Sequence, residues 1–114
     1  MKNFFEQAVK HQIEGRFDNA IFLYDKCIEK KINIYQSYNN KGLIYLVLKK
    51  YHNAEIYLKK ATEGNEFFLD AHNNLSVLYN KINNYKLAIY YAKIALKRNP
   101  NNADILSNLG NYLS

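Results

Sequence analysis

The sequence predicts an all-α protein assembled from repeated helix pairs, and three observations support this. Apolar residues recur at helical spacing, as in Ala88, Ala92 and Ala95. Only 4 glycines and 1 proline occur in 114 residues, and the alternation of apolar and polar residues typical of strands is scarce. A short pattern, an aromatic residue followed three positions later by alanine, returns at a constant interval.

The interval is 34 residues, because the three alanines are Ala20, Ala54 and Ala88. Residues typical of turns divide each interval in two, which leaves room for two helices. The turns are predicted at Gly15-Arg16, Lys31 to Asn33, Lys49-Lys50, Gly64-Asn65, Asn83-Asn84 and Pro100 to Asn102. The predicted helices are 2–14, 18–31, 35–48, 52–63, 69–82, 86–98 and 103–113.

Each predicted helix has an apolar stripe or a defined end. Helix 2–14 ends at the first turn, and helix 18–31 carries its stripe at Ala20, Tyr24 and Cys27. Helix 35–48 is apolar nearly all round, which predicts burial on two sides or an exposed apolar face. Turn residues bound helices 52–63 and 69–82, and the alanine stripe above marks helix 86–98.

The last predicted helix, 103–113, has an apolar stripe of its own. Leu106, Leu109 and Leu113 recur at spacings of three and four. Part of the stripe should pack on helix 86–98, and the rest has no following helix within the chain. An exposed leucine stripe favours association, so we predict that the chain either forms a homo-oligomer through the C-terminal helix or frays there as a monomer.

Two helices in every 34 residues resemble the tetratricopeptide repeat. The resemblance gives three full repeats, 1–34, 35–68 and 69–102, and a partial repeat or cap at 103–114, all in one domain. It implies a right-handed solenoid of antiparallel helix pairs, about seven helices in all. First helices would line a concave groove, and second helices would form the convex back.

The register of this resemblance rests on small residues. Position 20 is always alanine, and position 8 is small in every repeat, as Ala8, Gly42, Ser76 and Gly110. Both positions are expected where neighbouring helices approach closely. Gln7 and Lys41 stand where the family usually has leucine, so the first two repeats diverge from the pattern.

Composition and charge exclude several function classes. The formal charge is +6, but the lysines are dispersed among acidic residues and do not form a binding arm, which places nucleic-acid binding last. No apolar run reaches the roughly 18 residues of a membrane helix, so no membrane partner is expected. A single cysteine, Cys27, and the absence of a signal-peptide pattern predict a cytoplasmic protein.

No residue constellation for catalysis is present, and we predict no enzyme activity, no cofactor and no metal site. His11, His52 and His72 lack metal-ligand spacing and fall at three different repeat positions. Cys27 occupies a position that the family fills with a small buried residue, so an inert core thiol is expected.

The candidate binding residues lie on the predicted first helices. Asn40, Asn74 and Asn108 all fall at position 6, where the resemblance implies amides that face the groove and bond the backbone of an extended peptide. The alternative explanation is that these three asparagines recur by chance, because the chain is rich in asparagine throughout. Other positions that the family uses to line the groove supply Asn39, Asn73, Phe5, Val9, Leu43, Val47, Val77 and Lys81.

The family's clamp for C-terminal carboxylates is largely missing. It requires lysine and asparagine where this chain has Phe5 and Val9, and basic residues where it has Asp70 and Asn74; only Asn40 is retained. A heat-shock-protein tail is therefore not the ligand we expect.

The predicted function is that of a protein–protein interaction module, or adaptor, which binds an extended peptide or partner segment in its groove. The alternative is the N-terminal substrate-recognition region of a larger enzyme such as a glycosyltransferase, since the family is often fused in that way. That alternative stays open because the chain ends inside a first helix. A basic-surface binder of nucleic acid comes third.

Overall fold

The computed structural model describes residues 3–64 and 68–113, without the side chains of residues 68, 112 and 113. The described residues form seven helices and no strand. The helices are α1 (Phe4–Ile13), α2 (Phe17–Glu29), α3 (Ile34–Val47), α4 (Tyr51–Ala61), α5 (Phe68–Lys81), α6 (Tyr85–Arg98) and α7 (Ala103–Leu113). Every predicted helix is present, with bounds shifted by at most two residues, and the all-α prediction is confirmed.

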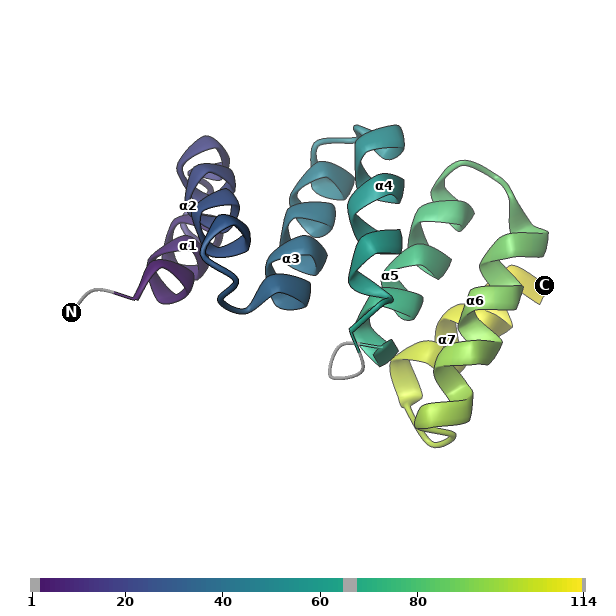
Figure 1. The fold of residues 1–114 in the computed structure, drawn as a ribbon. Helices are drawn as coiled ribbons and strands as arrows, with labels where there is room; N and C mark the ends of the chain where they lie inside the picture. Colours follow the sequence, from purple (N-terminus) through teal and green to yellow (C-terminus); the bar gives the residue numbers. More distant parts are fainter. Residues whose placement is uncertain (1–2, 65–67, 114) are drawn as a thin grey trace.

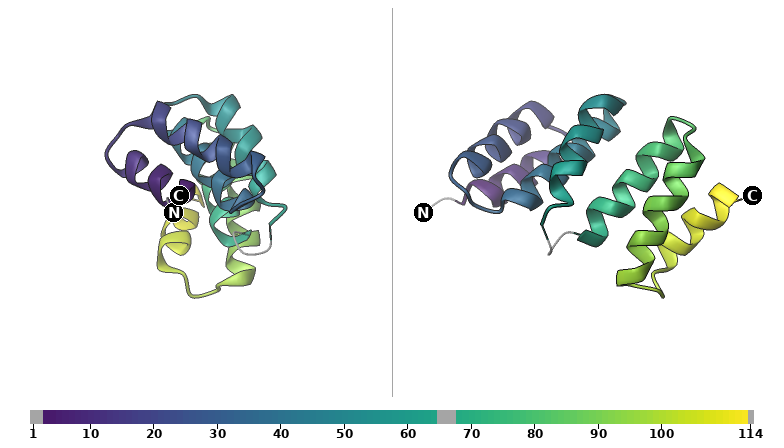
Figure 2. Two further views of the ribbon diagram at one scale, coloured as in Figure 1. Left: turned by 60° about the vertical axis from the view of Figure 1, so that its left-hand side comes forward. Right: turned by 45° about the vertical axis from the view of Figure 1, so that its right-hand side comes forward.

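The helices form three antiparallel pairs in a row, with α7 packed on the last pair (Figure 1). The pairs are α1 with α2, α3 with α4, and α5 with α6, and each second helix contacts the first helix of the next pair. The molecule is elongated, 47 × 26 × 21 Å, and its row of helices is seen from two further directions in Figure 2. This nearest-neighbour stacking is the arrangement of a helical solenoid.

The turn within each pair has the same backbone conformation. Gly15, Lys49 and Asn83 stand 34 residues apart, and their φ angles are 79°, 62° and 64°. A left-handed residue after a helix lets the chain reverse and satisfy its last carbonyl groups. Gly15 adopts this conformation without strain, because it has no Cβ.

Small residues let the two helices of a pair approach closely, as predicted. Ala20, Ala54 and Ala88 are all 0% exposed. A Cβ on Gly42 would lie 2.6 Å from the Cγ atom of Leu58, so glycine is required there. The Ser76 hydroxyl fits the same space in the third pair and donates a hydrogen bond of 2.8 Å to the carbonyl oxygen of Ala88.

Part of the leucine stripe of α7 packs on α6, as predicted, but the most buried residue of the helix was not predicted. Ile105, which the predicted stripe left out, is 1% exposed and packs with Ala92 and Ala95 of α6, and Leu109 joins this cluster. Leu106, which we expected in the stripe, is 46% exposed. The side chain of Leu113 lies outside the described residues. The helix therefore packs through a face centred on Ile105 and Leu109.

The junction between α2 and α3 contains a buried charge beside its apolar core, whereas a leucine stands at the same place in the junction between α4 and α5. Lys41 of α3 is buried and bonds the Oδ1 atom of Asp25 on α2 at 2.6 Å. Its ammonium group also lies 3.9 Å from the ring centre of Tyr57 on α4, a cation–π contact. At the equivalent place Leu75 of α5 packs in a core cluster with Leu58 of α4. Burial of a charge thus replaces burial of a leucine in the first junction.

Candidate functional site

The candidate binding residues all lie on first helices, namely α1, α3 and α5, or on α7, which starts the partial repeat. Among the first helices, α3 contacts α5 and α5 contacts α7, and each of these contacts is more extensive than any between two second helices. First helices that approach each other more closely than second helices place themselves on the inside of the curve. We call the surface formed by α1, α3 and α5 the inner face.

Two of the three asparagines at repeat position 6, Asn40 and Asn74, are half-buried, and their amide nitrogens form hydrogen bonds within the chain. Asn40 Nδ2 donates to the hydroxyl oxygen of Tyr24 at 3.2 Å, and that hydroxyl donates to Gln12 Oε1 at 2.5 Å. Asn74 Nδ2 donates to Asn39 Oδ1 at 2.9 Å. These bonds join α3 to α2 and α5 to α3, so the amides also hold neighbouring helix pairs in register.

The remaining predicted amides differ in their surroundings. Asn39 is only 5% exposed, because Asn74 covers it. Asn73 is half-buried, and its Oδ1 atom is buried without a hydrogen-bond partner among the described residues. Asn108 is half-buried on α7. A buried amide oxygen without a donor costs free energy, so a donor group that reached Asn73 would be favoured.

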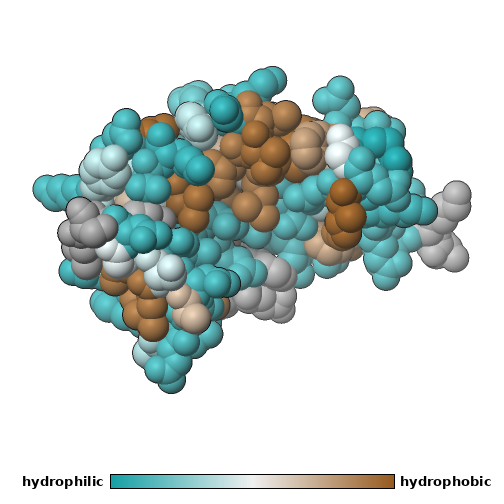
Figure 3. Space-filling view, turned by 180° about the vertical axis from the view of Figure 1, so that it is seen from behind, coloured by the Kyte–Doolittle hydropathy of each residue, from teal (hydrophilic) through white to brown (hydrophobic). Residues whose placement is uncertain are grey.

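Apolar side chains surround these amides on the first helices. Of the predicted members, Phe5, Val9, Leu43 and Val77 are half-buried, and Lys81 is exposed. Val47 is 65% exposed. Seen from behind, the molecule shows an apolar area near its upper centre, bordered by hydrophilic surface (Figure 3). Ile13, which the same family positions place beside Phe5 and Val9, stands at the repeat position of Val47 and is 79% exposed.

Tyr24 connects the inner face to the core. Burial raises the pKa of its hydroxyl group to about 12, a shift that the hydrogen bond from Asn40 partly opposes. The ring is 0% exposed and stacks at a tilt on Phe5, with 5.9 Å between ring centres. Tyr79 of α5 also has a raised pKa, caused by burial and then by its hydrogen bond to Glu55.

We expect the raised pKa of Tyr24 to make folding sensitive to alkali. Below pH 10 the hydroxyl is protonated in both the folded and the unfolded chain, so it does not make the free energy of unfolding depend on pH. Between about pH 10 and 12 the unfolded chain loses this proton and the folded chain keeps it, so stability falls by about 1 to 2 kcal/mol. Urea unfolding at pH 8 and pH 11 should show a smaller fall for Tyr24→Phe than for wild type. Exposed Tyr90→Phe is the control, and an unchanged fall in Tyr24→Phe would contradict the assignment.

The described residues offer little for catalysis. They contain no group of three or more His, Cys, Asp or Glu side chains placed to hold a metal ion. Cys27 is buried, and burial raises the pKa of its thiol. The nearby Ser37 hydroxyl opposes this shift, and burial is the larger effect. A protonated, covered thiol is a poor nucleophile, in keeping with the predicted inert core residue.

The structure has a hollow between α1 and α2 of the first pair, which we did not expect from the sequence. It has a volume of about 420 Å³ and is lined by Gln7, His11, Asp18, Asn19, Phe22 and Leu23. The face of α1 that borders it is polar. The hollow is wide open to solvent and contains none of the predicted binding residues.

None of the seven described helices has both the length and the apolar character that a membrane-spanning helix needs.

Comparison with family models decides the classification. The model described as "Tetratricopeptide repeat" matches residues 35–66 and 69–102, which is more than half of the chain. The chain belongs to the tetratricopeptide repeat family. The first helix pair lies outside the matched residues, in keeping with Gln7 at a position where the family usually has leucine.

Two solved structures show the same tetratricopeptide-repeat fold. One is the first tetratricopeptide-repeat domain of Spaghetti (RPAP3) bound to the HSP90 peptide SRMEEVD, at a TM-score of 0.85 and 22% identity, covering 96% of this chain and 86% of that one. The other is MamA (AMB-1), at a TM-score of 0.78 and 21% identity, covering 96% of this chain and 60% of that one. No curated protein matches the sequence.

Proposed function

We propose that this tetratricopeptide-repeat domain is a non-catalytic protein-interaction module that binds an extended segment of a partner protein along its inner face. The observation that carries the proposal is the row of half-buried amides, Asn40, Asn73 and Asn74, which lies among partly exposed apolar side chains. Amides can pair with the backbone of an extended chain, and apolar contacts supply most of the binding free energy. A cytoplasmic location is part of this proposal.

The internal hydrogen bonds suggest which amide atoms serve the ligand. Asn40 and Asn74 use their nitrogens on Tyr24 and Asn39. Their carbonyl oxygens would accept hydrogen bonds from the backbone N–H groups of the bound segment. The nitrogen bonds fix the orientation of each amide in advance, which lowers the entropy lost on binding.

The preferred ligand is an internal, partly apolar segment and not a free C-terminus. Phe5, Val9 and Asp70 occupy places where a carboxylate clamp needs basic or amide groups. Asp70 is exposed and would repel a terminal carboxylate. Leu43, Val47 and Val77 would contact apolar side chains of the segment. The Spaghetti domain, which shares the fold, was solved with a bound peptide, and this supports a peptide ligand for the present chain.

The partner-binding proposal is tested with peptides selected from a random library against the purified chain. We expect Asn40→Ala combined with Asn74→Ala to weaken binding of the selected peptides by about 1 to 3 kcal/mol, roughly 5- to 150-fold, because bound N–H groups lose their acceptors. Isothermal titration calorimetry measures the change. Asn19→Ala with Asn53→Ala, which alters two exposed amides of second helices, is the matched control. Equal affinity of the Asn40/Asn74 variant and wild type would overturn the proposal.

Self-association through α7 remains a prediction from the sequence. Among its described side chains, Leu106 is 46% exposed, whereas Ile105 and Leu109 pack on α6. The apolar surface left on α7 is therefore smaller than the leucine stripe suggested. Leu106→Lys should abolish any dimer formed there.

A further inference from the structure

The outer face, formed by the second helices α2, α4 and α6, carries a row of exposed apolar residues. Phe22, Ile56 and Tyr90 all occupy repeat position 22, and they are 61%, 40% and 56% exposed. The same position in the second helices of three consecutive pairs therefore directs a large apolar side chain to solvent. Their regular placement raises the question of what surrounds them.

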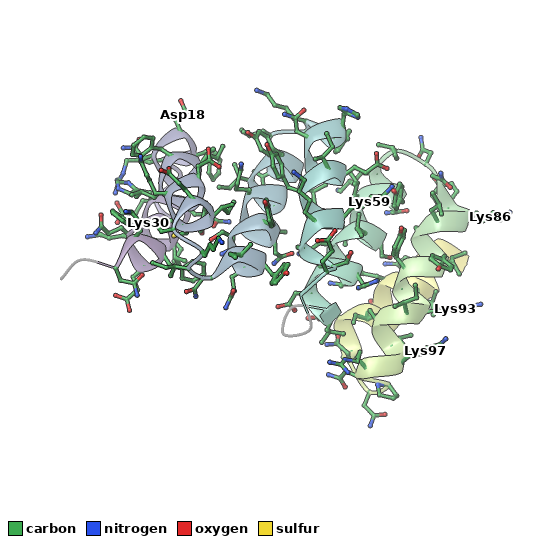
Figure 4. The ribbon with its side chains drawn as sticks, viewed as in Figure 1. Asp18, Lys30, Lys59, Lys86, Lys93 and Lys97 are labelled. Carbon is green, nitrogen blue, oxygen red and sulfur yellow. The ribbon has the colours of Figure 1, made fainter. Side chains whose placement is uncertain are left out.

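On α6 three lysines lie on the same side of the helix as Tyr90. Lys86, Lys93 and Lys97 lie four before, three after and seven after Tyr90, so the four side chains share one stripe of the helix. All three lysines are exposed, and α6 contains no acidic residue. Figure 4 shows the three lysines projecting from α6 to the same side, away from the rest of the molecule. Within the described chain they have no ion-pair partner. We call these four residues the basic stripe.

On α2 the same repeat positions are acidic. Asp18, Asp25 and Glu29 surround Phe22 at the spacings seen on α6. Asp18 is exposed, and the side chains of Asp25 and Glu29 are 54% and 70% exposed although they bond Lys41 and Lys26. We call these four residues the acidic stripe.

The surroundings of the two stripes limit what each can bind. Lys26 lies beside the acidic stripe, 5.4 Å from the ring centre of Phe22, and Lys30 follows it on the same flank. In the second pair the equivalent positions are mixed, with His52 and Lys59 on α4 and Glu63 just after it. The charge of the outer face thus changes sign from the first pair to the third, and the two stripes lie at opposite ends of the molecule (Figure 1).

We propose that the outer face is a self-association surface, in which the acidic stripe of one copy docks on the basic stripe of the next. When α2 of one copy lies parallel to α6 of the next, each acidic residue lies opposite one lysine. The pairs are Asp18 with Lys86, Asp25 with Lys93, and Glu29 with Lys97. Phe22 comes to the height of Tyr90, and an aromatic contact closes the centre of the interface. Pairing α6 with α6, or α2 with α2, would bring like charges together, so the charges also select the orientation.

The contact is heterologous, because the two stripes are different surfaces of one molecule. Each copy in a pair keeps one free stripe, so association continues beyond the dimer as concentration rises. This growth distinguishes the contact from a symmetric pairing of α7 helices, which would stop at two copies. Exposed ion pairs are weak and sensitive to salt, so the association is a low-affinity one.

Sedimentation-velocity ultracentrifugation tests the proposal on the full chain. In about 0.1 M salt the weight-average sedimentation coefficient should rise continuously with protein concentration. In about 1 M salt, where the Debye length falls from about 10 Å to about 3 Å, the rise should disappear. A wild-type chain that stays monomeric at every concentration in low salt, or that forms only a salt-resistant dimer, would overturn the proposal.

Charge-reversal variants test whether the acidic and basic stripes form the contact. Lys93→Glu with Lys97→Glu should remain monomeric, and so should Asp18→Lys with Glu29→Lys. An equimolar mixture of these two variants should associate again, because each altered stripe then meets a complementary one. Lys10→Glu with Lys50→Glu, which makes the same charge change at exposed residues away from the stripes, should behave as wild type. Failure of the mixture to associate would contradict the pairing.

A nucleic acid is the other anionic partner that a lysine stripe could bind. Fluorescence anisotropy with a labelled single-stranded oligonucleotide, in the same low-salt buffer, distinguishes nucleic-acid binding from self-association. Binding that Lys93→Glu with Lys97→Glu abolishes, in a chain that shows no self-association, would replace our proposal by nucleic-acid binding. No binding of the oligonucleotide at concentrations where the chain self-associates is the result we expect.

Discussion

Leu75→Ala is expected to lower the free energy of unfolding by about 2 to 5 kcal/mol, the range for truncating a fully buried leucine. Leu75 is 0% exposed and packs with Leu58, Leu78 and Ala88 in the core cluster between the second and third helix pairs. Its removal would leave a cavity at the junction through which the two pairs support each other. Urea unfolding followed by circular dichroism measures the loss.

The control for Leu75 is its counterpart in the first pair. Gln7 occupies the same repeat position on α1, is half-buried, and has no preceding helix within the chain. Gln7→Ala should change stability by less than about 0.5 kcal/mol, as is usual away from the core. Equal effects of the two substitutions would show that the junction at Leu75 does not hold the solenoid together.

Asp25→Asn is expected to destabilise the chain by about 2 to 4 kcal/mol, because it leaves the charge of buried Lys41 without its partner. The value lies below that of a fully buried pair, since half of the Asp25 side chain reaches solvent and Tyr57 still contacts the ammonium group. Lys41→Met removes the charge as well as the need for a partner. It should be neutral or stabilising, because methionine fills a similar volume in an apolar junction.

Hydrogen exchange together with urea unfolding reports both changes. In Asp25→Asn the amides of α1 and α2 should lose protection before those of α5 and α6, since the first pair is held only through this junction. In Lys41→Met the first pair should be at least as protected as in wild type. A large loss of stability in Lys41→Met would mean that the ion pair and the cation–π contact stabilise the fold more than an apolar side chain can.

The helices and their order could be predicted from the sequence because the strongest signals are local or periodic. The interval between Ala20, Ala54 and Ala88 fixes the repeat length, and the burial of all three follows from it. The partial repeat was predicted less well. The spacing of the leucines left out Ile105, the residue that packs most deeply on α6. Its repeat position, which aligns it with buried Ala71 of α5, would have indicated it.

The candidate site could be predicted only in outline. The repeat register placed Asn39, Asn40 and Asn74 on first helices, but it did not reveal which amides bond each other. The bond between Asn74 and Asn39 joins residues 35 apart in sequence, and it depends on how closely α3 approaches α5. Asparagine gives no signal of its own for such a pairing, since the chain is rich in this residue throughout.

Charged residues were the hardest to interpret. Lys41 stood out only as a departure from leucine, and its partner Asp25 lies 16 residues away on another helix. The acidic and basic stripes of the outer face were missed because the register was compared for core positions only. Comparing positions 18, 25 and 29 across the repeats would have shown the change of sign without a structure.

The central claim, that the inner face binds a partner segment, is tested most directly by nuclear magnetic resonance. A library-selected peptide is titrated into the ¹⁵N-labelled chain, and the amide shifts of both backbone and asparagine side chains are followed. We predict that the largest changes fall on α3 and α5, including the side-chain amides of Asn40 and Asn74, and that Lys86 to Lys97 of α6 are unaffected. Changes confined to α2, α4 and α6, with the inner face unperturbed, would contradict the proposal.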